Sequence, residues 1–409
     1  MTATKTVLTH IAQLLQVRET PDKPLVGTDF NELPLLENAF LKISDGRIEA
    51  FGHMENLGSI EGYTEIDCSH RLVLPSYIDS HTHLVYAGDR TLEFADRIQG
   101  LTYAEIAEKG GGILNSAALL AKTDEETLYH AAFERLQQAI QLGTGAIEIK
   151  TGYGLSTEAE LKMLRVIERL RSASPIPIKA TYLAAHAVPT AFKSNPDAYV
   201  DLIINETLPQ VAALEIAEYI DVFLETNYFN IAQTERILAA AAQYQLKPKI
   251  HVNQFTTIGG ITTAVKHGAL SVDHLEVMAP EDYDALANSK TVAVALPSCS
   301  FFIQIPYTPA KELIQRNIPL VLATDFNPGT SPSLNMNFVV ALACIQMKLT
   351  AEQALNAATL NAAFALELQH ELGSIAVGKR AQLIITKPMR SYWEIPYYFG
   401  NNPIERVIF

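Results

Sequence analysis

Short apolar runs alternate with amphipathic segments through the middle of this chain, and this alternation limits the fold more than any other feature of the sequence. Short apolar runs bounded by turn signals are typical of buried strands, and strands that alternate with helices pair in parallel. Eight such units between residues 72 and 365 predict a (β/α)8 TIM-like barrel, although an open, doubly wound sheet fits the alternation alone equally well. The eight runs are residues 72–79, 146–150, 178–182, 219–223, 249–252, 270–273, 292–296 and 320–323.

Residues 123–142 illustrate the helical segments between these runs. Thr123 and Glu126 have the spacing of a capping box, which predicts a helix start at this point. Gly143 follows as a helix stop. The apolar residues in between recur every four positions, as on the buried face of a helix: Leu128, Ala132, Leu136 and Ile140.

Both ends of the chain have a different, β-rich character. Residues 38–52 contain two short apolar segments about the turn Ser44-Asp45-Gly46, a pattern that predicts a hairpin. Residues 373–385 combine turn glycines with a closing apolar run, and residues 405–409 suit a last strand. We therefore expect two domains: a small β-sandwich formed by residues 1–71 plus 366–409, and the barrel formed by residues 72–365.

Composition narrows the class of protein. With 48% hydrophobic and 19% charged residues among 409, the chain can bury a large core. A net charge of −14 argues against a nucleic-acid or anionic-membrane partner. Three cysteines without CxxC spacing indicate neither a disulfide framework nor a thiolate zinc site. There is no apolar run of membrane-spanning length, and the first residues lack the pattern of a signal peptide, so we expect a cytoplasmic protein.

Histidines and one aspartate follow the predicted strands, where TIM-type barrels carry their chemistry. His81 and His83 follow the first run, and residues i and i+2 of an extended chain point to the same side. Imidazoles that converge in this way suit Zn²⁺ or iron. The other residues in equivalent places are His251, His274 and Asp325, with His186 just beyond the third run. Three histidines and a carboxylate leave room for a bound water.

Each of these residues alone has a simpler explanation. A single histidine near a strand end is usually a hydrogen-bonded structural residue, and it is the joint placement that favours a metal site. Lys150 ends the second run, and we interpret it as a strand-end residue or as one that lies behind the metal ligands; the alternative is a carbamylated lysine that bridges two metals. Residues 110–112 are interpreted as a rim loop, because no Gly-Lys-[ST] phosphate motif follows them. The remaining histidines receive no role: His10, His53, His70, His130, His267 and His370.

The run from Leu74 to Arg90 resembles the metal-binding strand of the amidohydrolase superfamily. Further blocks are similar to the imidazolonepropionase family of histidine degradation, and this similarity extends over essentially the whole chain. The similar blocks are Arg90, Glu93-Phe94 and residues 110–113, 148–155, 181–187 and 323–330. The blocks Lys-Thr-Gly-Tyr-Gly-Leu and Thr-Asp-Phe-Asn-Pro-Gly-Thr are far more specific than His-x-His alone.

This resemblance implies hydrolysis of the cyclic amide of 4-imidazolone-5-propanoate, a small anionic substrate, to N-formimidoyl-L-glutamate. It also implies a homodimer. One Zn²⁺ or Fe³⁺ per subunit would be held by His81, His83, His251 and Asp325. Arg90 suits the carboxylate of the substrate, because a guanidinium binds it through two parallel hydrogen bonds. The implied substrate-binding set is Arg90, Tyr153, His186, Asn327, Gly329 and Thr330; a rim salt bridge for Arg90 and a simple turn for Tyr153 are the alternatives.

Two positions depart from the family pattern. Several members have an acidic residue three positions after the strand-five histidine, where this chain has Gln254. An amide cannot take a proton from water, so we expect Gln254 to orient the substrate and leave the general base to Asp325 or His274. In our hypothesis Asp325 takes the proton and passes it to the ring nitrogen, while His274 hydrogen-bonds the oxyanion. At Gln382, where the family has aspartate, we expect no effect on the chemistry.

Two other functions fit parts of the sequence. A deaminase of a heterocyclic amine would keep the fold and the metal but would release ammonia. An inactive scaffold relative would be expected to have lost ligand residues, and this chain retains all four.

Overall fold

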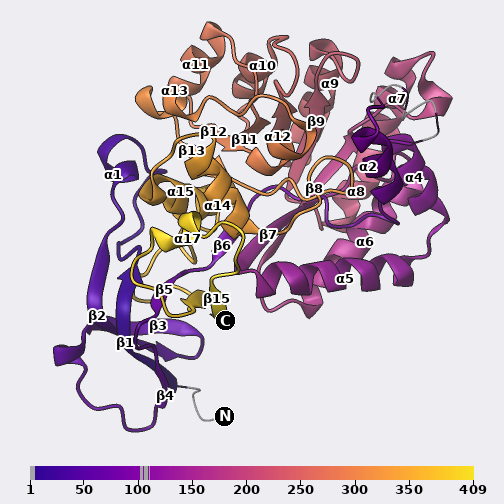
Figure 1. Cartoon of the computed structure of the whole chain (residues 1–409). Coiled ribbons are helices and arrows are strands. Elements are labelled where there is room, and N and C mark those ends of the chain that lie inside the picture. Colours follow the sequence, from indigo (N-terminus) through magenta and orange to yellow (C-terminus); the bar gives the residue numbers. More distant parts are fainter. Residues whose placement is uncertain (1–4, 102–104, 106–108, 110) are drawn as a thin grey trace.

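The computed structural model describes residues 5–101, 105, 109 and 111–409 of the chain. Gly110 of the predicted rim loop lies outside these residues. Two sheets organise the fold, an eight-stranded parallel sheet and a seven-stranded mixed sheet. Figure 1 shows the mixed sheet to one side of the larger α/β body, with strands from both chain ends side by side in it.

The parallel sheet is the predicted barrel. Its strands follow one another in chain order, which a doubly wound sheet would not do. Beyond the first and last strands the ring is closed by a bridge between Thr82 and Phe326, where the amide of His83 donates to the carbonyl of Phe326 at 2.8 Å. The strands are β6 Tyr77–Asp79, β7 Thr144–Lys150, β8 Ile178–Ala185, β9 Tyr219–Leu224, β10 Lys247–Val252, β11 Ser271–His274, β12 Val292–Ala295 and β13 Leu320–Leu322.

The first predicted barrel strand, residues 72–79, is wrong as a single element. β5 (Leu72–Pro75) pairs with β1 and β14 in the mixed sheet, and only β6 joins the barrel. At the break the amide of Ser76 donates to the carbonyl of Gln382 at 3.0 Å. Both halves are buried, so hydrophobicity continues across the point where the chain changes sheets. By its pairing, β5 therefore belongs with the terminal strands.

Helices occupy the connections between barrel strands. In α5 (Glu125–Gln141) the four predicted core residues are buried and Gly143 follows in a left-handed conformation, as expected. The predicted cap is wrong: the Asp124 side chain accepts from the amide of Thr127, while Thr123 donates to Leu119 at the end of the preceding helix. The connecting helices are α2 Thr91–Ile98, α4 Ile113–Lys122, α5, α6 Thr157–Ala173, α7 Pro196–Leu202, α8 Leu208–Leu214, α9 Ile231–Ala242, α10 Gly260–Lys266, α11 Pro280–Ala287, α12 Pro297–Ile303 and α13 Ala310–Gln315.

The remaining helices follow β13 or lie outside the barrel connections: α1 Gly27–Asn31, α14 Met336–Ile345, α15 Ala351–Ala358, α16 Leu360–Ala365 and α17 Glu394–Tyr397. Figure 1 shows α14, α15 and α17 between the barrel and the mixed sheet. Within the described residues, no helix combines the length and the apolar character needed to cross a bilayer.

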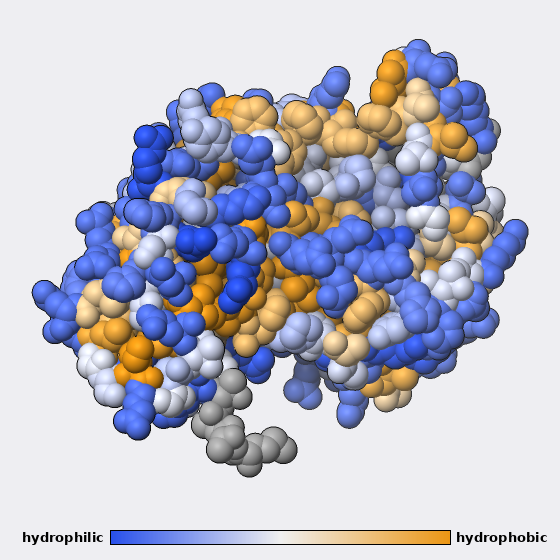
Figure 2. Space-filling view, turned by 60° about the horizontal axis from the view of Figure 1, so that its bottom comes forward, coloured by the Kyte–Doolittle hydropathy of each residue, from blue (hydrophilic) through white to orange (hydrophobic). Residues whose placement is uncertain are grey.

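The expected β-sandwich takes the form of the seven-stranded mixed sheet, built from both chain ends. β2 and β3 form the predicted hairpin, and Asp45 and Gly46 in its turn both have positive φ (49° and 73°). The strands of the mixed sheet are β1 Lys5–Leu15, β2 Leu35–Ser44, β3 Arg47–His53, β4 Thr64–Asp67, β5, β14 Leu383–Thr386 and β15 Ile404–Ile408. Hydrophilic residues cover most of the face in Figure 2, and apolar residues gather where this sheet meets the barrel.

Candidate active site

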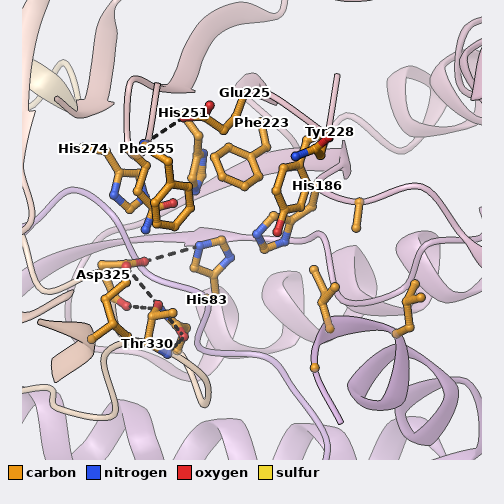
Figure 3. Close-up of a pocket in the computed structure, with 18 of the residues that line it drawn as sticks. His83, His186, Phe223, Glu225, Tyr228, His251, Phe255, His274, Asp325 and Thr330 are labelled. Atoms are coloured by element: carbon orange, nitrogen blue, oxygen red, sulfur yellow. Dashed lines mark hydrogen bonds and ion pairs between the residues drawn. The ribbon is translucent and has the colours of Figure 1, made fainter. Parts of the chain in front are cut away.

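A cavity of about 1130 Å³ opens at the carboxyl ends of the barrel strands. Figure 3 shows its lining side chains arriving from several strand ends around one space. The structure thus brings together the residues that strand-end placement singled out. Predicted site residues that line the cavity are His83, Arg90, Tyr153, His186, His251, Gln254, His274, Asp325, Asn327 and Thr330.

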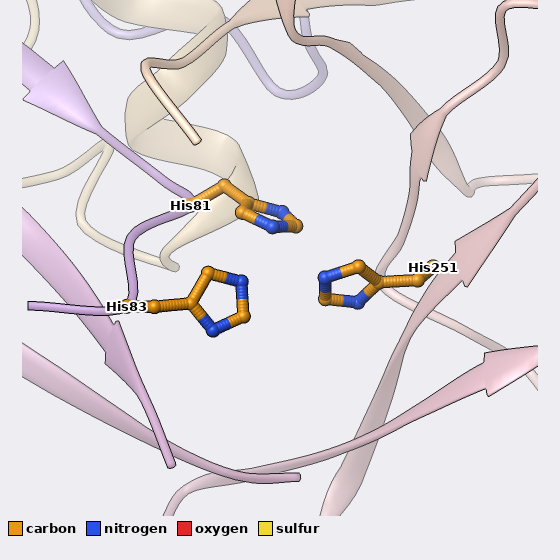
Figure 4. A group of neighbouring side chains, drawn as sticks. All are labelled: His81, His83 and His251. Atoms are coloured by element: carbon orange, nitrogen blue, oxygen red, sulfur yellow. The ribbon is translucent and has the colours of Figure 1, made fainter. Parts of the chain in front are cut away.

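A cluster of imidazoles forms the floor of the cavity. His81 and His83, just after β6, and His251, in β10, place ring nitrogens within 4.8 Å of one another, and all three residues are buried. Figure 4 shows the three rings turned toward a shared space. Asp325, after β13, completes the group, because its Oδ1 lies 3.5 Å from Nε2 of His81 and 3.7 Å from Nε2 of His83.

The orientation of two of these imidazoles is fixed by carboxylates behind them. Nδ1 of His81 lies 2.6 Å from Oδ2 of Asp273, and Nδ1 of His251 lies 2.8 Å from Oδ2 of Asp221. With ionised carboxylates as acceptors, each Nδ1 carries the proton and each Nε2 has a free lone pair.

Nε2 of His81 and Nε2 of His251 are buried without a hydrogen-bond partner among the described residues. Leaving such an atom unsatisfied costs on the order of 1–3 kcal/mol. A metal ion at the centre would satisfy both, and imidazole with carboxylate is a donor set that zinc and iron accept. These residues therefore fit a metal ion.

The two residues expected to handle protons, Asp325 and His274, lie in strained backbone. Both have positive φ (53° and 92°), which is uncommon for residues other than glycine and is concentrated at functional sites. Burial raises the pKa of Asp325 to about 6, against the lowering effect of His274. The ligand atoms of these two residues and of His81 also lie within 4.8 Å of one another.

His274 has a partner that sequence reasoning missed. Its Nδ1 lies 3.2 Å from Oε1 of Glu276, which is itself buried. Burial alone would lower the pKa of His274, but the charge and hydrogen bond of Glu276, together with the charges of Asp325 and Asp273, outweigh burial and raise it to about 9. Glu276 follows a strand-end histidine by two residues, and this spacing is the only signal that pointed to it.

Arg90 turns its guanidinium toward the cavity. The side chain is 9% exposed, and Nε donates to Oγ of Ser116 at 3.0 Å. Nη2 is buried without a partner among the described residues, and Glu93, the nearest carboxylate to Nε, lies 3.9 Å away. At 3.9 Å this is an ion pair without a hydrogen bond, and the buried Nη2 remains available to an anion in the cavity. Arg97, which the sequence did not single out, lines the same cavity.

Aromatic and amide side chains form the walls. His186 stacks on His83 with ring centroids 5.0 Å apart, and burial lowers the pKa of His186 to about 4, so the ring is neutral. The ring of Tyr153 lies 5.8 Å from the Arg90 guanidinium. Nε2 of Gln254 lies 3.4 Å from Sγ of Cys299.

Asn327 shapes the adjoining loop. Its Oδ1 accepts the amide hydrogens of Gly329 and Thr330 at 2.8 and 2.7 Å, and Nδ2 donates to the Asp325 carbonyl. These bonds fix the loop that presents Thr330 to the cavity. Glu225, directly after β9, also lines the cavity and was missed, although its strand-end position was visible.

Comparison with known proteins places the chain in a family. The Amidohydrolase family model matches residues 235–408. The chain is 57% identical to the imidazolonepropionase of Flavobacterium johnsoniae over 98% of both chains. It is 40% identical to that of Caldanaerobacter subterraneus over 94% of this chain and 92% of the relative.

Solved structures agree on the fold. A mutant atrazine chlorohydrolase of Arthrobacter aurescens, determined with zinc and atraton, aligns with TM-score 0.74 and 17% identity over 98% of this chain and 93% of its own. Escherichia coli guanine deaminase aligns with TM-score 0.68 and 15% identity over 98% and 97%. Amidohydrolase-superfamily enzymes are metal-dependent hydrolases, in keeping with the imidazole cluster described above. With 57% identity over nearly its whole length, the chain belongs to the imidazolonepropionase family.

Proposed function

We propose that the protein hydrolyses the cyclic amide of 4-imidazolone-5-propanoate to N-formimidoyl-L-glutamate. The observation that carries this proposal is the placement of the imidazole cluster and of the Arg90 guanidinium, whose buried Nη2 has no hydrogen-bond partner among the described residues, on one cavity. The cluster suits hydrolysis of an amide, and the guanidinium suits the carboxylate of this substrate. The names of the curated relatives support the same reaction.

His81, His83, His251 and Asp325 would hold one Zn²⁺ or Fe³⁺. Such an ion would lower the pKa of a water that it binds toward about 7. The buried, unpartnered Nε2 atoms of His81 and His251 support this ligand set. Metal analysis of the protein purified without chelator distinguishes zinc from iron.

Substrate binding is assigned to the cavity walls. Arg90 donates two parallel hydrogen bonds to the propanoate carboxylate, and Tyr153 beside it lines the same pocket. The neutral ring of His186 and the amide of Gln254 line the space left for the imidazolone ring. Gln254 can both donate and accept hydrogen bonds, so it orients the ring without exchanging a proton with it.

The reaction adds one water across the ring amide. Asp325 accepts a proton from the attacking water as its oxygen bonds to the carbonyl carbon, and His274 donates a hydrogen bond to the carbonyl oxygen as negative charge develops there. Asp325 then returns the proton to the ring nitrogen while the carbon–nitrogen bond breaks. The products are the new carboxylate and the formimidoyl-substituted amine of one molecule.

The decisive experiment uses freshly prepared imidazolone propanoate. We expect its ultraviolet absorbance to fall on incubation with the metal-replete protein, N-formimidoyl-L-glutamate to accumulate and no ammonia to be released. Ammonia release would instead support a deaminase, and unchanged absorbance would reject the proposal.

We also propose a cytoplasmic homodimer that acts on this small anionic molecule and has no nucleic-acid or membrane partner. The family resemblance supports the dimer, and the net charge of −14 supports the absence of polyanionic partners. Sedimentation equilibrium tests the dimer.

A further inference from the structure

A layer of charged side chains lies inside the barrel beneath the imidazole cluster, and the reaction above does not use it. It contains two lysines and three carboxylates, a formal excess of one negative charge. All five side chains are 0% exposed: Lys150, Lys249, Glu148, Asp221 and Asp273. Burying so many charges is costly unless each is paired, so their arrangement requires an explanation.

Lys150, at the end of β7, lies at the centre of this layer. Its Nζ is 2.7 Å from Oε1 of Glu148, 2.9 Å from Oδ2 of Asp221 and 3.7 Å from Oδ2 of Asp273. The same two aspartate oxygens accept from Nδ1 of His251 and Nδ1 of His81. One ammonium therefore lies between the two carboxylates that orient two of the proposed metal ligands.

We propose that Lys150 is a positioning residue of the metal centre, whose ammonium holds the carboxylates of Asp221 and Asp273 in place so that His81 and His251 present Nε2 to the cation. This inference rests on the metal site of the proposed function and adds to it a residue that does not touch the metal.

The role follows from shared oxygens. Oδ2 of Asp273 and Oδ2 of Asp221 each contact both the Lys150 ammonium and a histidine Nδ1, so a shift of either carboxylate would turn the imidazole that it orients. Three buried carboxylates this close together repel one another unless cations are paired with them. Lys150 supplies a positive charge to both aspartates at once.

The charge state of Lys150 agrees with this role. Burial alone would lower its pKa, but Asp221, Glu148 and Asp273 more than compensate and raise it above the usual value. An amine that stays protonated has no lone pair to react with carbon dioxide. We therefore assign Lys150 as a paired ammonium in place of a carbamylated, metal-bridging ligand.

The test compares Lys150→Met with Lys249→Met. Lys249 is a matched control, because it is equally buried in the same layer and its ion pair within the described residues is with Glu148, at 2.7 Å. Zn²⁺ affinity of the metal-free proteins is measured by competition with a chromophoric chelator, and melting temperature reports folding. We expect Lys150→Met to weaken Zn²⁺ binding about 10–100-fold, as loss of a partner behind a metal ligand typically does. Lys249→Met should weaken it much less.

The proposal is overturned if folded Lys150→Met keeps the wild-type affinity, or if both variants lose affinity equally. Should Lys150→Met not fold, Lys150→Gln replaces it, because it keeps hydrogen-bond donors while removing the charge. Wild-type affinity in that variant would equally reject the role of the ammonium. ¹⁵N NMR of labelled histidines adds a direct readout: fixed Nδ1–H tautomers of His81 and His251 in the metal-free wild type, and a mixture of tautomers in the variant. Failure of the wild type to bind Zn²⁺ would instead remove the metal site itself.

Discussion

The guanidinium of Arg90 occupies the space that a side chain at position 329 would need. A Cβ built on Gly329 would come well inside 3.0 Å of Nη1 of Arg90, although the backbone of Gly329 does not have a positive φ. A glycine at this position therefore lets the Arg90 guanidinium keep its place at the cavity wall, beside the loop fixed by Asn327.

Gly329→Ala should consequently displace Arg90 and weaken substrate binding. We expect KM to rise about tenfold or more with a smaller fall in kcat, because the metal ligands are untouched. Steady-state kinetics with imidazolone propanoate measure both constants. Gly400→Ala is the control, since a Cβ at Gly400 would meet nothing within 4 Å. Equal kinetics for the two variants would contradict the assignment.

Removing the guanidinium itself should have a similar but larger effect. Arg90→Ala is expected to raise KM more than it lowers kcat, because the lost contact is present in both the bound substrate and the transition state. Arg90→Lys keeps the charge but cannot form two parallel hydrogen bonds, so its KM should lie between those of wild type and Arg90→Ala. If Arg90→Ala leaves KM unchanged, Arg90 does not bind the carboxylate.

Asp325 is assigned two roles that one substitution separates. Asp325→Asn keeps an oxygen that can coordinate a metal but cannot accept a proton from water. We expect kcat to fall roughly 10²–10⁴-fold, the usual contribution of a general base, while most of the metal is retained. His251→Ala should lose metal and turnover together. Metal content and kcat are measured on the same preparations, and near-normal kcat in Asp325→Asn would transfer the base role to another residue.

The site residues that could be predicted from the sequence are those whose position depends only on the order of residues along the chain. Each barrel strand is an apolar run, and the polar residue at its end lies at the mouth of the barrel. This rule identified His81, His251, His274 and Asp325. The change of sheet between β5 and β6 was not predictable in this way, because both halves are buried and apolar.

Contacts between strands that are distant in the sequence could not be predicted either. Asp221, Asp273 and Lys150 lie within apolar runs as isolated charged residues, and nothing in their local pattern says that they meet. Only closure of the barrel brings β7, β9 and β11 to a common axis. Glu276 was missed for a related reason, since its pairing with His274 depends on the positive φ values at His274 and Leu275.

The C-terminal part of the chain offers a prediction that is independent of catalysis. Lys379 is 4% exposed, and its Nζ donates to the carbonyls of Gln369 and Leu372 and to Oγ of Ser374. Burial lowers its pKa to about 8, against the raising effect of nearby acidic groups. In the unfolded chain the pKa returns to about 10.4.

Between these two pKa values the unfolded state binds more protons than the folded state. The contribution of Lys379 to the free energy of unfolding therefore rises as pH increases from about 8 to about 10.4, by at most about 1.4 kcal/mol per pH unit. Urea unfolding of wild type and Lys379→Met across this range measures the effect, because other titrating groups cancel in the difference. The free energy of unfolding of the wild type minus that of Lys379→Met should increase as pH rises. A difference that stays constant with pH would mean that Lys379 has the same pKa in both states, and that its three acceptors fully compensate its burial.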